Sequence, residues 1–514
     1  MSNWNHGYVT DITYTKGYYA TLNPLRIKLC FLAQKLLPPK IDTACELAFG
    51  QGITLNFNAA SGNASWYGTD FNPSQAAYAQ SIANISGADV KIYDDSFEEF
   101  LNRKDLPQFD FIALHGIYSW VSPEVREQIV NFLRQKLAVG GACLISYNCQ
   151  PGWAAMAPMR DLLRAYATYL TPSGKPSAVR AREGLEFVGE LLALPSTESI
   201  KNPQSIAMLQ TLQKMDDVYL AHELLNEYQV SLNFLQMSQQ LQGAKLDFAS
   251  YCNYANHLIG LQLSNDEKQL LSQTSNNRTI YEMLKDLMFA TSFRSDYFAK
   301  GAVQLSDAQC NEELNKLQIV LSHPFEQLDY TLQTHRGTLK LNQDFYEPLF
   351  DAIKNYEPIS VAELRETLAS KLKREVQFTE MIESLIALGQ KEYVKLVQEK
   401  DKVAQAMPQT QRLNTYILEQ AFHSPNSINH LISPLTAEAV SFNRFELIAI
   451  YASLHKKSQN ERVELIMQQL KKQGEKISKD GKALSDAEVK QELEKQIQNI
   501  QAWIPVLQKL QILS

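Results

Sequence analysis

Between residues 41 and 150, short apolar segments alternate with segments of helical periodicity. The apolar segments, expected to be strands, are 41–49, 65–71, 90–95, 109–116 and 142–148. Nearly continuous apolar strands separated by amphipathic helices indicate a parallel sheet with helices on both faces. Ligands of such sheets bind at the carboxyl ends of the strands, so the residues that end each strand are the first candidates for a site.

The stretch Thr43–Phe57 is typical of a strand, a glycine turn and a helix. The turn contains Gly50 and Gly52, and Ala48 occupies the position where a further glycine is expected. A dinucleotide site requires G-x-G-x-x-G, but counting from Gly50 puts Leu55 at the third glycine. No GK[ST] follows, so a phosphate-binding P-loop is absent too. Taken alone, the turn is either a tight structural turn or a loop for a ligand without phosphate.

Glu46 to Gly52, read as Glu-Leu-Ala-Phe-Gly-Gln-Gly, is similar to acidic-x-G-x-G-x-G. That pattern is the first motif of class I S-adenosylmethionine-dependent methyltransferases, here with Ala48 in place of a glycine. Such a site also needs an acidic residue at the end of the next strand to accept hydrogen bonds from the ribose hydroxyls. Asp70 stands there, although an aspartate in this position is also a common helix-flanking residue.

Two further elements follow the third and fourth predicted strands. Asp94, Asp95 and Ser96, after the third strand, are polar residues suited to the adenine amine. The last element expected of such a site is the turn at His115 and Gly116, after the fourth strand. His115 is either a general base or a histidine whose ring is satisfied by the backbone. The residues expected to hold S-adenosylmethionine in this part of the chain are Glu46, Ala48, Gly50, Gly52, Asp70, Phe71, Asp95, Ser96, His115 and Gly116.

A narrower resemblance covers roughly residues 8–302. The segments "LHGIYSWVS", "SYNCQPGW", "VYLAHELLNEY" and "FATSFRSDYFAKG" resemble methyltransferases that carry a methyltransferase regulatory domain. That group includes bacterial protein-lysine methyltransferases acting on outer-membrane proteins, and the resemblance implies a cytoplasmic bacterial enzyme and a homodimer. It also implies that Tyr8, Tyr14 and Tyr18 form part of a cap over the cofactor.

Methyl transfer from a sulfonium needs a positioned acceptor with a free lone pair, and aromatic faces suit both the sulfonium and an ammonium. The loops after the fourth and fifth predicted strands supply the residues expected to be catalytic: Tyr118, Trp120, Asn148 and Trp153. The two tryptophans read equally well as core residues beneath a helical insertion. Asn148 is either an amide that orients the acceptor or a turn residue. In "FRSDYF", Arg294 is expected to pair with Asp296 or with another domain.

The predicted fold class is α/β, a Rossmann-like class I methyltransferase sheet with a helical insertion and mainly helical C-terminal domains. The segment 244–251 is a candidate sixth strand, and 345–400 has the order of helices and strand of a winged helix. The expected domains are an N-terminal cap segment 1–40; a methyltransferase domain 41–262 with its insertion at about 170–228; a helical middle domain 263–340; a winged-helix-like domain 341–455; and a charged linker with a terminal helix 456–514.

Composition narrows the classes of partner. A formal net charge of −7 and the lack of a dense basic face give no reason to expect nucleic acid. No basic and apolar leader and no apolar run of about 18 residues is visible, so neither a signal peptide nor a membrane span is expected. Six scattered cysteines predict reduced thiols. "HELLNE" has Asn226 where a zinc helix needs its second histidine, so no metal is predicted.

The sequence therefore predicts an S-adenosylmethionine-dependent methyltransferase that acts by in-line displacement. Its acceptor is expected to be a protein side chain, most simply a lysine amine of an outer-membrane or surface protein. The alternative acceptor is a small molecule or a sugar of a surface glycan. A module that keeps the fold for assembly without catalysis is disfavoured because Glu46, Gly50, Gly52 and Asp70 are all present.

Overall fold

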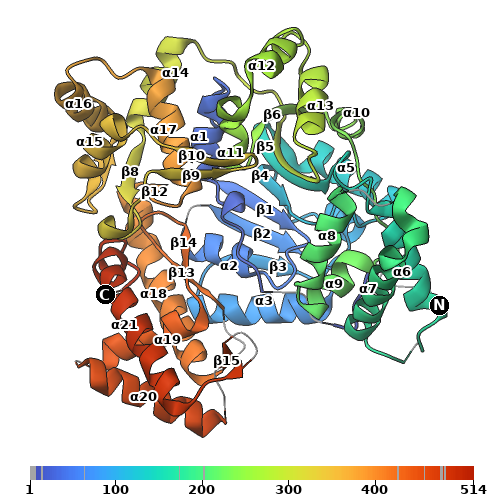
Figure 1. The fold of residues 1–514 in the computed structure, drawn as a ribbon. Coiled ribbons are helices and arrows are strands. Elements are labelled where there is room, and N and C mark those ends of the chain that lie inside the picture. Colours follow the sequence, from blue (N-terminus) through green and yellow to red (C-terminus); the bar gives the residue numbers. More distant parts are fainter. Residues whose placement is uncertain are drawn as a thin grey trace.

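The computed structural model describes residues 7–12, 16–62, 64–172, 174–200, 203–424, 428–456, 458–474, 478–479 and 482–513. A seven-stranded sheet with the order β3-β2-β1-β4-β5-β7-β6 forms the centre of the molecule (Figure 1). Its strands are β1 Thr43–Leu47, β2 Ser65–Thr69, β3 Val90–Tyr93, β4 Phe109–Leu114, β5 Leu137–Asn148, β6 Asp247–Tyr251 and β7 Phe293–Ala299. The first five pair in parallel, and β7 runs antiparallel to both of its neighbours. The predicted α/β fold class is confirmed.

The candidate sixth strand within 244–251 is present as β6, but it reaches the sheet only through β7. The sheet therefore extends beyond residue 262, where the methyltransferase domain was expected to end. The sequence reading missed β7 because Arg294 and Asp296 interrupt its apolar residues. Both side chains are nevertheless buried, because they neutralise each other with neighbouring charges inside the protein.

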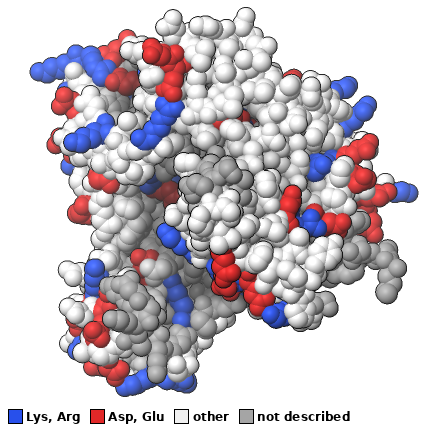
Figure 2. All heavy atoms as spheres, turned by 45° about the vertical axis from the view of Figure 1, so that its right-hand side comes forward, with Lys and Arg blue, Asp and Glu red and all other residues white. Residues whose placement is uncertain are grey.

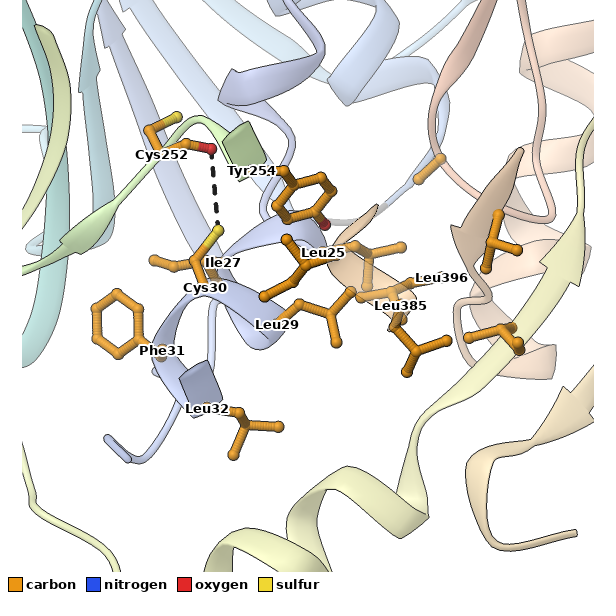
Figure 3. Close-up of a cluster of buried hydrophobic side chains, with 14 of the residues drawn as sticks. Leu25, Ile27, Leu29, Cys30, Phe31, Leu32, Cys252, Tyr254, Leu385 and Leu396 are labelled. Carbon is orange, nitrogen blue, oxygen red and sulfur yellow. Dashed lines mark hydrogen bonds between the residues drawn. The ribbon is translucent and has the colours of Figure 1, made fainter. Parts of the chain in front are cut away.

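Each face of the sheet is covered by helices, and the cores on the two faces are separate. On one face lie α4 Phe97–Asn102, α5 Pro123–Lys136 and α10 Phe234–Gln242, whose apolar side chains cluster with those of β4 and β5. The other face carries α1 Arg26–Ala33, α2 Ile53–Ala60 and α3 Pro73–Ser86. Figure 3 shows α1 packing against Tyr254, Leu385 and Leu396, with the Cys30 thiol directed at the carbonyl oxygen of Cys252 (Sγ–O 3.9 Å). Helix α1 thus joins the sheet to the C-terminal part of the chain.

Four helices between β5 and α10 form a separate layer beside the carboxyl ends of the strands (Figure 1). They are α6 Ala157–Tyr169, α7 Ser177–Ala193, α8 Pro203–Gln213 and α9 Asp217–Leu224, with a 3-10 turn at Pro195–Ile200. Their apolar side chains form one cluster with Trp120 and Trp153. The layer begins at α6, earlier than the insertion predicted at about 170–228, because α6 packs on α7 in the same cluster.

The segment between β6 and the C-terminal part runs through α11 Tyr254–His257, a 3-10 turn at Ile259–Gln262, α12 Asn265–Ser272 and α13 Arg278–Met288. Beyond β7 the described elements are α14 Asp307–Lys316, β8 Gln318–Leu321, β9 Thr331–Thr334, β10 Gly337–Lys340, α15 Gln343–Ile353, β11 Ile359–Ser360, α16 Val361–Leu372, α17 Phe378–Gln390, β12 Val394–Leu396, α18 Lys400–His423, β13 His430–Ile432, β14 Ala439–Ser441, α19 Arg444–His455, α20 Gln459–Gln473, β15 Ser478–Lys479, β16 Lys482–Ala483 and α21 Asp486–Lys509. Short 3-10 turns lie at Ala20–Leu22 and Phe325–Gln327.

The helix and strand order expected of a winged helix is present from α15 to β12. The third strand of its small sheet is β8, which precedes the first helix, and β12 leads into the long helix α18. The predicted terminal helix is α21, which begins at the capping box of Ser485 and Glu488 and packs on α19 within the same chain. Of the predicted flexible stretch before it, 475–477 and 480–481 lie outside the described residues.

The charged side chains on the surface do not gather by sign on the face that we describe. On the face drawn in Figure 2, Lys and Arg side chains lie interspersed with Asp and Glu, and much of the centre is uncharged. Among the residues that the structure describes, no helix combines the length and hydropathy that a bilayer span requires.

Candidate active site

The turn after β1 brings three left-handed residues, at alternate positions, to the carboxyl edge of the sheet. Ala48, Gly50 and Gly52 have φ values of 55°, 58° and 66°. A side chain at Gly52 would place its Cβ 2.5 Å from the Cβ of Ala79 on α3, so glycine is required there. Ala48 adopts the same backbone region despite its methyl group, and its N–H donates to the carbonyl of Thr69 (2.8 Å). The turn is therefore fixed against the end of β2.

Glu46, near the end of β1, is a buried carboxyl group with an unused oxygen. Its side chain is 4% exposed, and Oε2 has no hydrogen-bond partner among the described residues. Burial, together with the charge of Asp70, raises the pKa of Glu46 to about 8. An acceptor oxygen that is buried without a donor is costly in a folded protein, and a ligand that supplies the donor would remove that cost.

Asp70, which follows β2, connects the next strand to the glycine turn. Its Oδ2 accepts the Gly50 N–H (2.8 Å), and its Oδ1 accepts the Asn72 N–H (3.1 Å). Burial raises the pKa of Asp70 to about 7, although these two backbone hydrogen bonds lower it. Two buried carboxyl groups, Glu46 and Asp70, thus flank the turn from β1 and β2.

A cavity opens beside these groups, and we call it the first cavity. It is lined by Tyr8, Ala48, Phe71, Asp95, Ser96, Phe97, Ile117, Trp120, Val121, Ser122, Val125 and Gln128. Asp95 and Ser96 are already engaged within the protein: Asp95 pairs with Arg103 (3.0 Å), and the Ser96 hydroxyl caps α4 by accepting the Glu99 N–H. The first cavity combines apolar walls with a few polar groups, the usual composition of a small-molecule site.

The N-terminal segment contributes two tyrosines to this region: Tyr8, which was one of the three expected, and Tyr19, which was not. Tyr8 lines the first cavity, with its ring edge-to-face with Phe71 at 6.1 Å. Tyr18 does not line the first cavity, and its hydroxyl accepts the Ala439 N–H (3.2 Å) of the C-terminal region. Tyr19 instead reaches the site, with its ring 4.1 Å from that of His115. Tyr14 lies outside the described residues.

The turn after β4 contains a neutral histidine followed by a glycine with open space beside it. Burial lowers the pKa of His115 to about 4, and its Nδ1 has no partner among the described residues. The next residue, Gly116, has φ 71°, and a Cβ there would meet no atom within 4 Å. A histidine with such a low pKa is an uncharged wall at neutral pH and a weak base, so it suits contact with a cation more than proton removal.

The four predicted catalytic residues separate into three environments. Tyr118 faces the core, where its hydroxyl donates to Gln240 Oε1 (2.8 Å), and it does not line the first cavity. Trp153 is buried in the helical layer, edge-to-face with Trp120 at 6.1 Å, and only Trp120 also borders the first cavity. Asn148, at the end of β5, is 3% exposed, and its Nδ2 has no partner among the described residues.

A second cavity is bordered by Tyr19 and His115. It is lined by Tyr18, Tyr19, Ala20, Thr21, Arg26, His115, Tyr251, Asn253, Asn256, Ile259, Lys285, Asp286, Phe289, Ala290, Thr291, Ser292, Phe293, Arg294, Ser295, His335, Gly389, Gln390 and Glu392. These residues come from the N-terminal segment, the strands β4 and β7, and the C-terminal part of the chain. The second cavity is larger and more polar than the first, so it suits a different ligand.

The sequence did not predict Tyr19 as a residue of this region. Tyr19 lies next to the predicted Tyr18, and its ring contacts that of His115.

Comparison with known protein sequences shows which relatives share a family with this chain. Its sequence is 33% identical over 516 residues to the uncharacterized protein sll1526 of Synechocystis, and the match covers 99% of each chain. The chain belongs to the same family as sll1526. A second relative, the uncharacterized protein RP789 of Rickettsia prowazekii, is 22% identical over 98% of this chain and 93% of its own.

Residues 216–300 match the family model described as a predicted methyltransferase regulatory domain. Among solved structures, PKMT2 from Rickettsia typhi in complex with AdoHcy has the same fold, with a TM-score of 0.67, 17% identity, and coverage of 96% of this chain and 99% of that one. Residues 216–300 thus match a methyltransferase regulatory domain, and the chain as a whole has the fold of PKMT2.

Proposed function

We propose that the protein transfers a methyl group from S-adenosylmethionine to a lysine amine of a protein. The observation that carries this proposal is the pair of buried carboxyl groups, Glu46 and Asp70, on either side of a left-handed turn at the carboxyl edge of the sheet. A ligand with an ammonium group would supply the donor that Glu46 Oε2 lacks, and two hydroxyls would add donors to Asp70 beside its two backbone hydrogen bonds.

The residues present fit this methyl donor. Asp70 would accept hydrogen bonds from the ribose hydroxyls, and Glu46 Oε2 would accept one from the amino group of the methionine part. The first cavity, with Phe71, Asp95 and Ser96, would enclose the adenine. The AdoHcy bound to PKMT2, a protein of the same fold, supports this choice of ligand.

The bound donor supplies an activated methyl group, so the protein's task is to orient the acceptor and to exclude water. Gly116 leaves open space at the turn after β4, and the ring of its neighbour His115 lies 4.1 Å from that of Tyr19. An uncharged aromatic wall is compatible with a cationic sulfonium and with an ammonium that approaches it.

A lysine acceptor is supported by the second cavity and by the resemblance to protein-lysine methyltransferases. The second cavity is open to the surface and is bordered by Tyr19 and by His115 at the carboxyl end of β4, so a long side chain that entered it would approach this edge of the sheet from outside. The charged residues that line it are of both signs: Arg26, Lys285, Asp286, Arg294 and Glu392, with Asp286 paired to Arg294 (2.9 Å).

Isothermal titration with S-adenosylmethionine tests the donor. Asp70→Ala removes the acceptor of the ribose hydroxyls and the Gly50 contact, so affinity should fall by about tenfold or more. Asp89→Ala is the matched control, because Asp89 is an exposed aspartate paired only with Lys91 on the surface. Unchanged affinity in Asp70→Ala, or no binding by the wild-type protein, would contradict the proposal.

Incubation of the enzyme with methyl-labelled donor and a bacterial lysate tests the acceptor. Label in protein bands, recovered as methyl-lysine after hydrolysis, is the expected result. Label confined to the small-molecule or glycan fraction would instead support the alternative acceptors and end the lysine proposal.

A further inference from the structure

A groove beside the amino end of β1 is separate from both cavities described above. Two hollows there share six lining residues and form one groove, which we call the basic groove; the shared residues are Leu25, Lys28, Pro39, Lys40, Gln398 and Glu399. Its walls come from α1, the segment before β1, the end of α14 and the start of α18. It shares no lining residue with the first or the second cavity. Because the segment 38–42 enters β1 at its amino end, the basic groove lies at the opposite edge of the sheet from the glycine turn.

Lysines outnumber carboxylates in the basic groove, although the whole chain has a formal net charge of −7. The lysines are Lys28, Lys40, Lys316, Lys400 and Lys402, and the carboxylates are Asp42, Glu313 and Glu399. Asp42 is paired with Lys40 (2.7 Å). Glu313 is paired with Lys316 (2.8 Å), which also contacts Glu312 outside the groove. Three lysines then remain against the single carboxylate of Glu399, so the groove has an excess of positive charge.

Lys28 on α1 is a cation that the fold leaves without a close counterion. Its side chain is partly buried, and no carboxylate oxygen of a described residue lies within 4.0 Å of its Nζ. Burial lowers the pKa of Lys28, and the charge of the more distant Glu399 offsets this in part. An ammonium group withdrawn from water without a counterion is unfavourable, so an anion bound in the groove would stabilise it.

The start of α18 adds a second attraction for an anion. Lys400 is the first residue of this 24-residue helix, and its N-cap, Glu399, makes no side-chain capping hydrogen bond. The first N–H groups of a helix have no partner within the helix, and the helix dipole adds partial positive charge there. Phosphate groups bind readily at such helix starts. Asp401, the acidic residue of the first turn, does not line the groove.

The dimensions of the groove favour a small ligand. The larger hollow has a volume of about 530 Å³, which is in the range of small-molecule sites. Leu25, Leu32 and Leu396 line it together with the lysines, so a ligand fits between walls and does not lie on a flat surface. A lysine ammonium is a compact point charge that suits phosphate oxygens, whereas planar carboxylates are matched better by arginine, which is absent from the lining.

We propose that the basic groove binds a small phosphate-bearing molecule, with Lys28 and Lys400 as its main cationic contacts. The ligand would lie between α1, near the beginning of the chain, and α18, far along it, and would join these two parts. This inference goes beyond the proposed methyl transfer and does not depend on it, because the two sites lie at opposite edges of the sheet.

Isothermal titration of the full-length protein with inorganic pyrophosphate, at constant pH and ionic strength, tests the proposal. Lys28→Met keeps an apolar side chain of similar length but removes the charge, so it should weaken binding by about tenfold. Lys400→Met should weaken binding by about threefold, since Lys400 is exposed and its charge is better screened. Glu399→Gln should have the opposite effect and strengthen binding by about threefold, because it removes the carboxylate that competes with the anion.

Lys490→Met is the matched control, because Lys490 is an exposed lysine on α21 that does not line the groove. It should bind pyrophosphate as the wild type does. Urea denaturation of each variant without ligand shows whether the fold is intact. If Lys28→Met did not fold, the opposite effects expected of Lys400→Met and Glu399→Gln, both at exposed residues, would decide the question.

Absence of pyrophosphate binding by the wild-type protein would overturn the proposal, and so would equal binding by the wild type and a folded Lys28→Met. Weaker binding by Glu399→Gln would contradict the role given to charge in the groove. A hexaglutamate peptide is the competing ligand class and should bind at least about tenfold more weakly than pyrophosphate. Equal binding of the two would overturn the assignment to phosphate and favour an acidic protein segment instead.

Discussion

Two groups of buried charges lie at the sheet, and they differ in whether the charges are paired. Beside β7, Arg294 contacts Asp296 (2.7 Å), Asp286 (2.9 Å) and Glu282 (3.0 Å), and Lys285 pairs with Glu282 (2.8 Å). At the ends of β1 and β2, Glu46 and Asp70 have no cation to neutralise them among the described residues, and Glu46 Oε2 has no partner there.

The pKa values record the same difference. Burial alone would raise the pKa of Glu282, yet Lys285 and Arg294 hold it at about 2. The pKa of Glu46 instead rises to about 8, because burial is reinforced by the charge of Asp70. Buried charges that are paired with one another are typical of the structural framework. A buried carboxyl group without a cation lowers the stability of the fold, and such groups are typical of sites that bind a ligand or carry out a reaction.

Removing the central cation should destabilise the paired group strongly. Arg294→Met leaves three buried carboxyl groups with one lysine, so the free energy of unfolding should fall by about 3–5 kcal/mol. Urea denaturation measures the change. Arg374→Met, which breaks the exposed pair with Glu380, is the control and should cost about 1 kcal/mol or less. A loss in Arg294→Met no larger than the control would mean that the network contributes nothing to stability.

In the unpaired group, removal of the ionisable side chain of Glu46 should raise the free energy of unfolding rather than lower it. The folded pKa of Glu46 near 8 lies above its ordinary value of 4.5. Between these pH values the folded state holds a proton that the unfolded state has released, so this group makes stability fall as pH rises. Glu46→Gln should therefore be more stable than the wild type by roughly 2–4 kcal/mol at pH 8.5 and show little difference at pH 4.

Thermal or urea denaturation across this pH range measures the effect, with the exposed Glu127→Gln as a control that should show no such trend. The same variant should bind S-adenosylmethionine about tenfold more weakly, because the amino group of the ligand loses an ionised partner. A variant that loses stability at high pH would show that Glu46 has a partner that pairs it in the folded protein.

The smallest expected effect concerns the turn itself. Ala48→Gly removes a methyl group from a residue at φ 55°, a conformation that costs a non-glycine residue about 1 kcal/mol. The greater freedom of glycine in the unfolded chain offsets about the same amount, so stability should change by less than about 1 kcal/mol. Affinity for S-adenosylmethionine should stay equal or improve.

Ala437→Gly is a matched control, because Ala437 has φ 52° but lines neither cavity. It should show the same small change in stability and no change in affinity. A large loss of affinity in Ala48→Gly alone would show that the methyl group contacts the ligand favourably.

Local patterns in the sequence were sufficient for the sheet and for the turn at its carboxyl edge. The alternation of apolar strands and amphipathic helices requires the parallel order, and the spacing between Gly50 and Asp70 puts both at that edge, where they share a hydrogen bond. Such features depend on neighbours within about one strand–helix–strand unit, which is the range over which sequence periodicity is informative.

Side-chain directions and distant contacts could not be predicted in this way. Tyr118 follows the same strand as His115, but Gln240 on α10 draws its hydroxyl into the core. The choice between Tyr18 and Tyr19 depends on Ala439, far along the chain.

The N-terminal segment also determines when, during synthesis of the chain, the walls of the two cavities can form. Tyr18 and Asn23 make hydrogen bonds to Ala439 and Ala437, across sequence separations of 421 and 414 residues. During synthesis these early residues must wait until almost the whole chain has emerged before their contacts exist, and closing so long a loop is slow. Tyr8 and Tyr19, which wall the two cavities, lie on this segment. A chain that stops before residue 437 should therefore fold its central sheet without acquiring a closed site, and methylation would be confined to finished molecules.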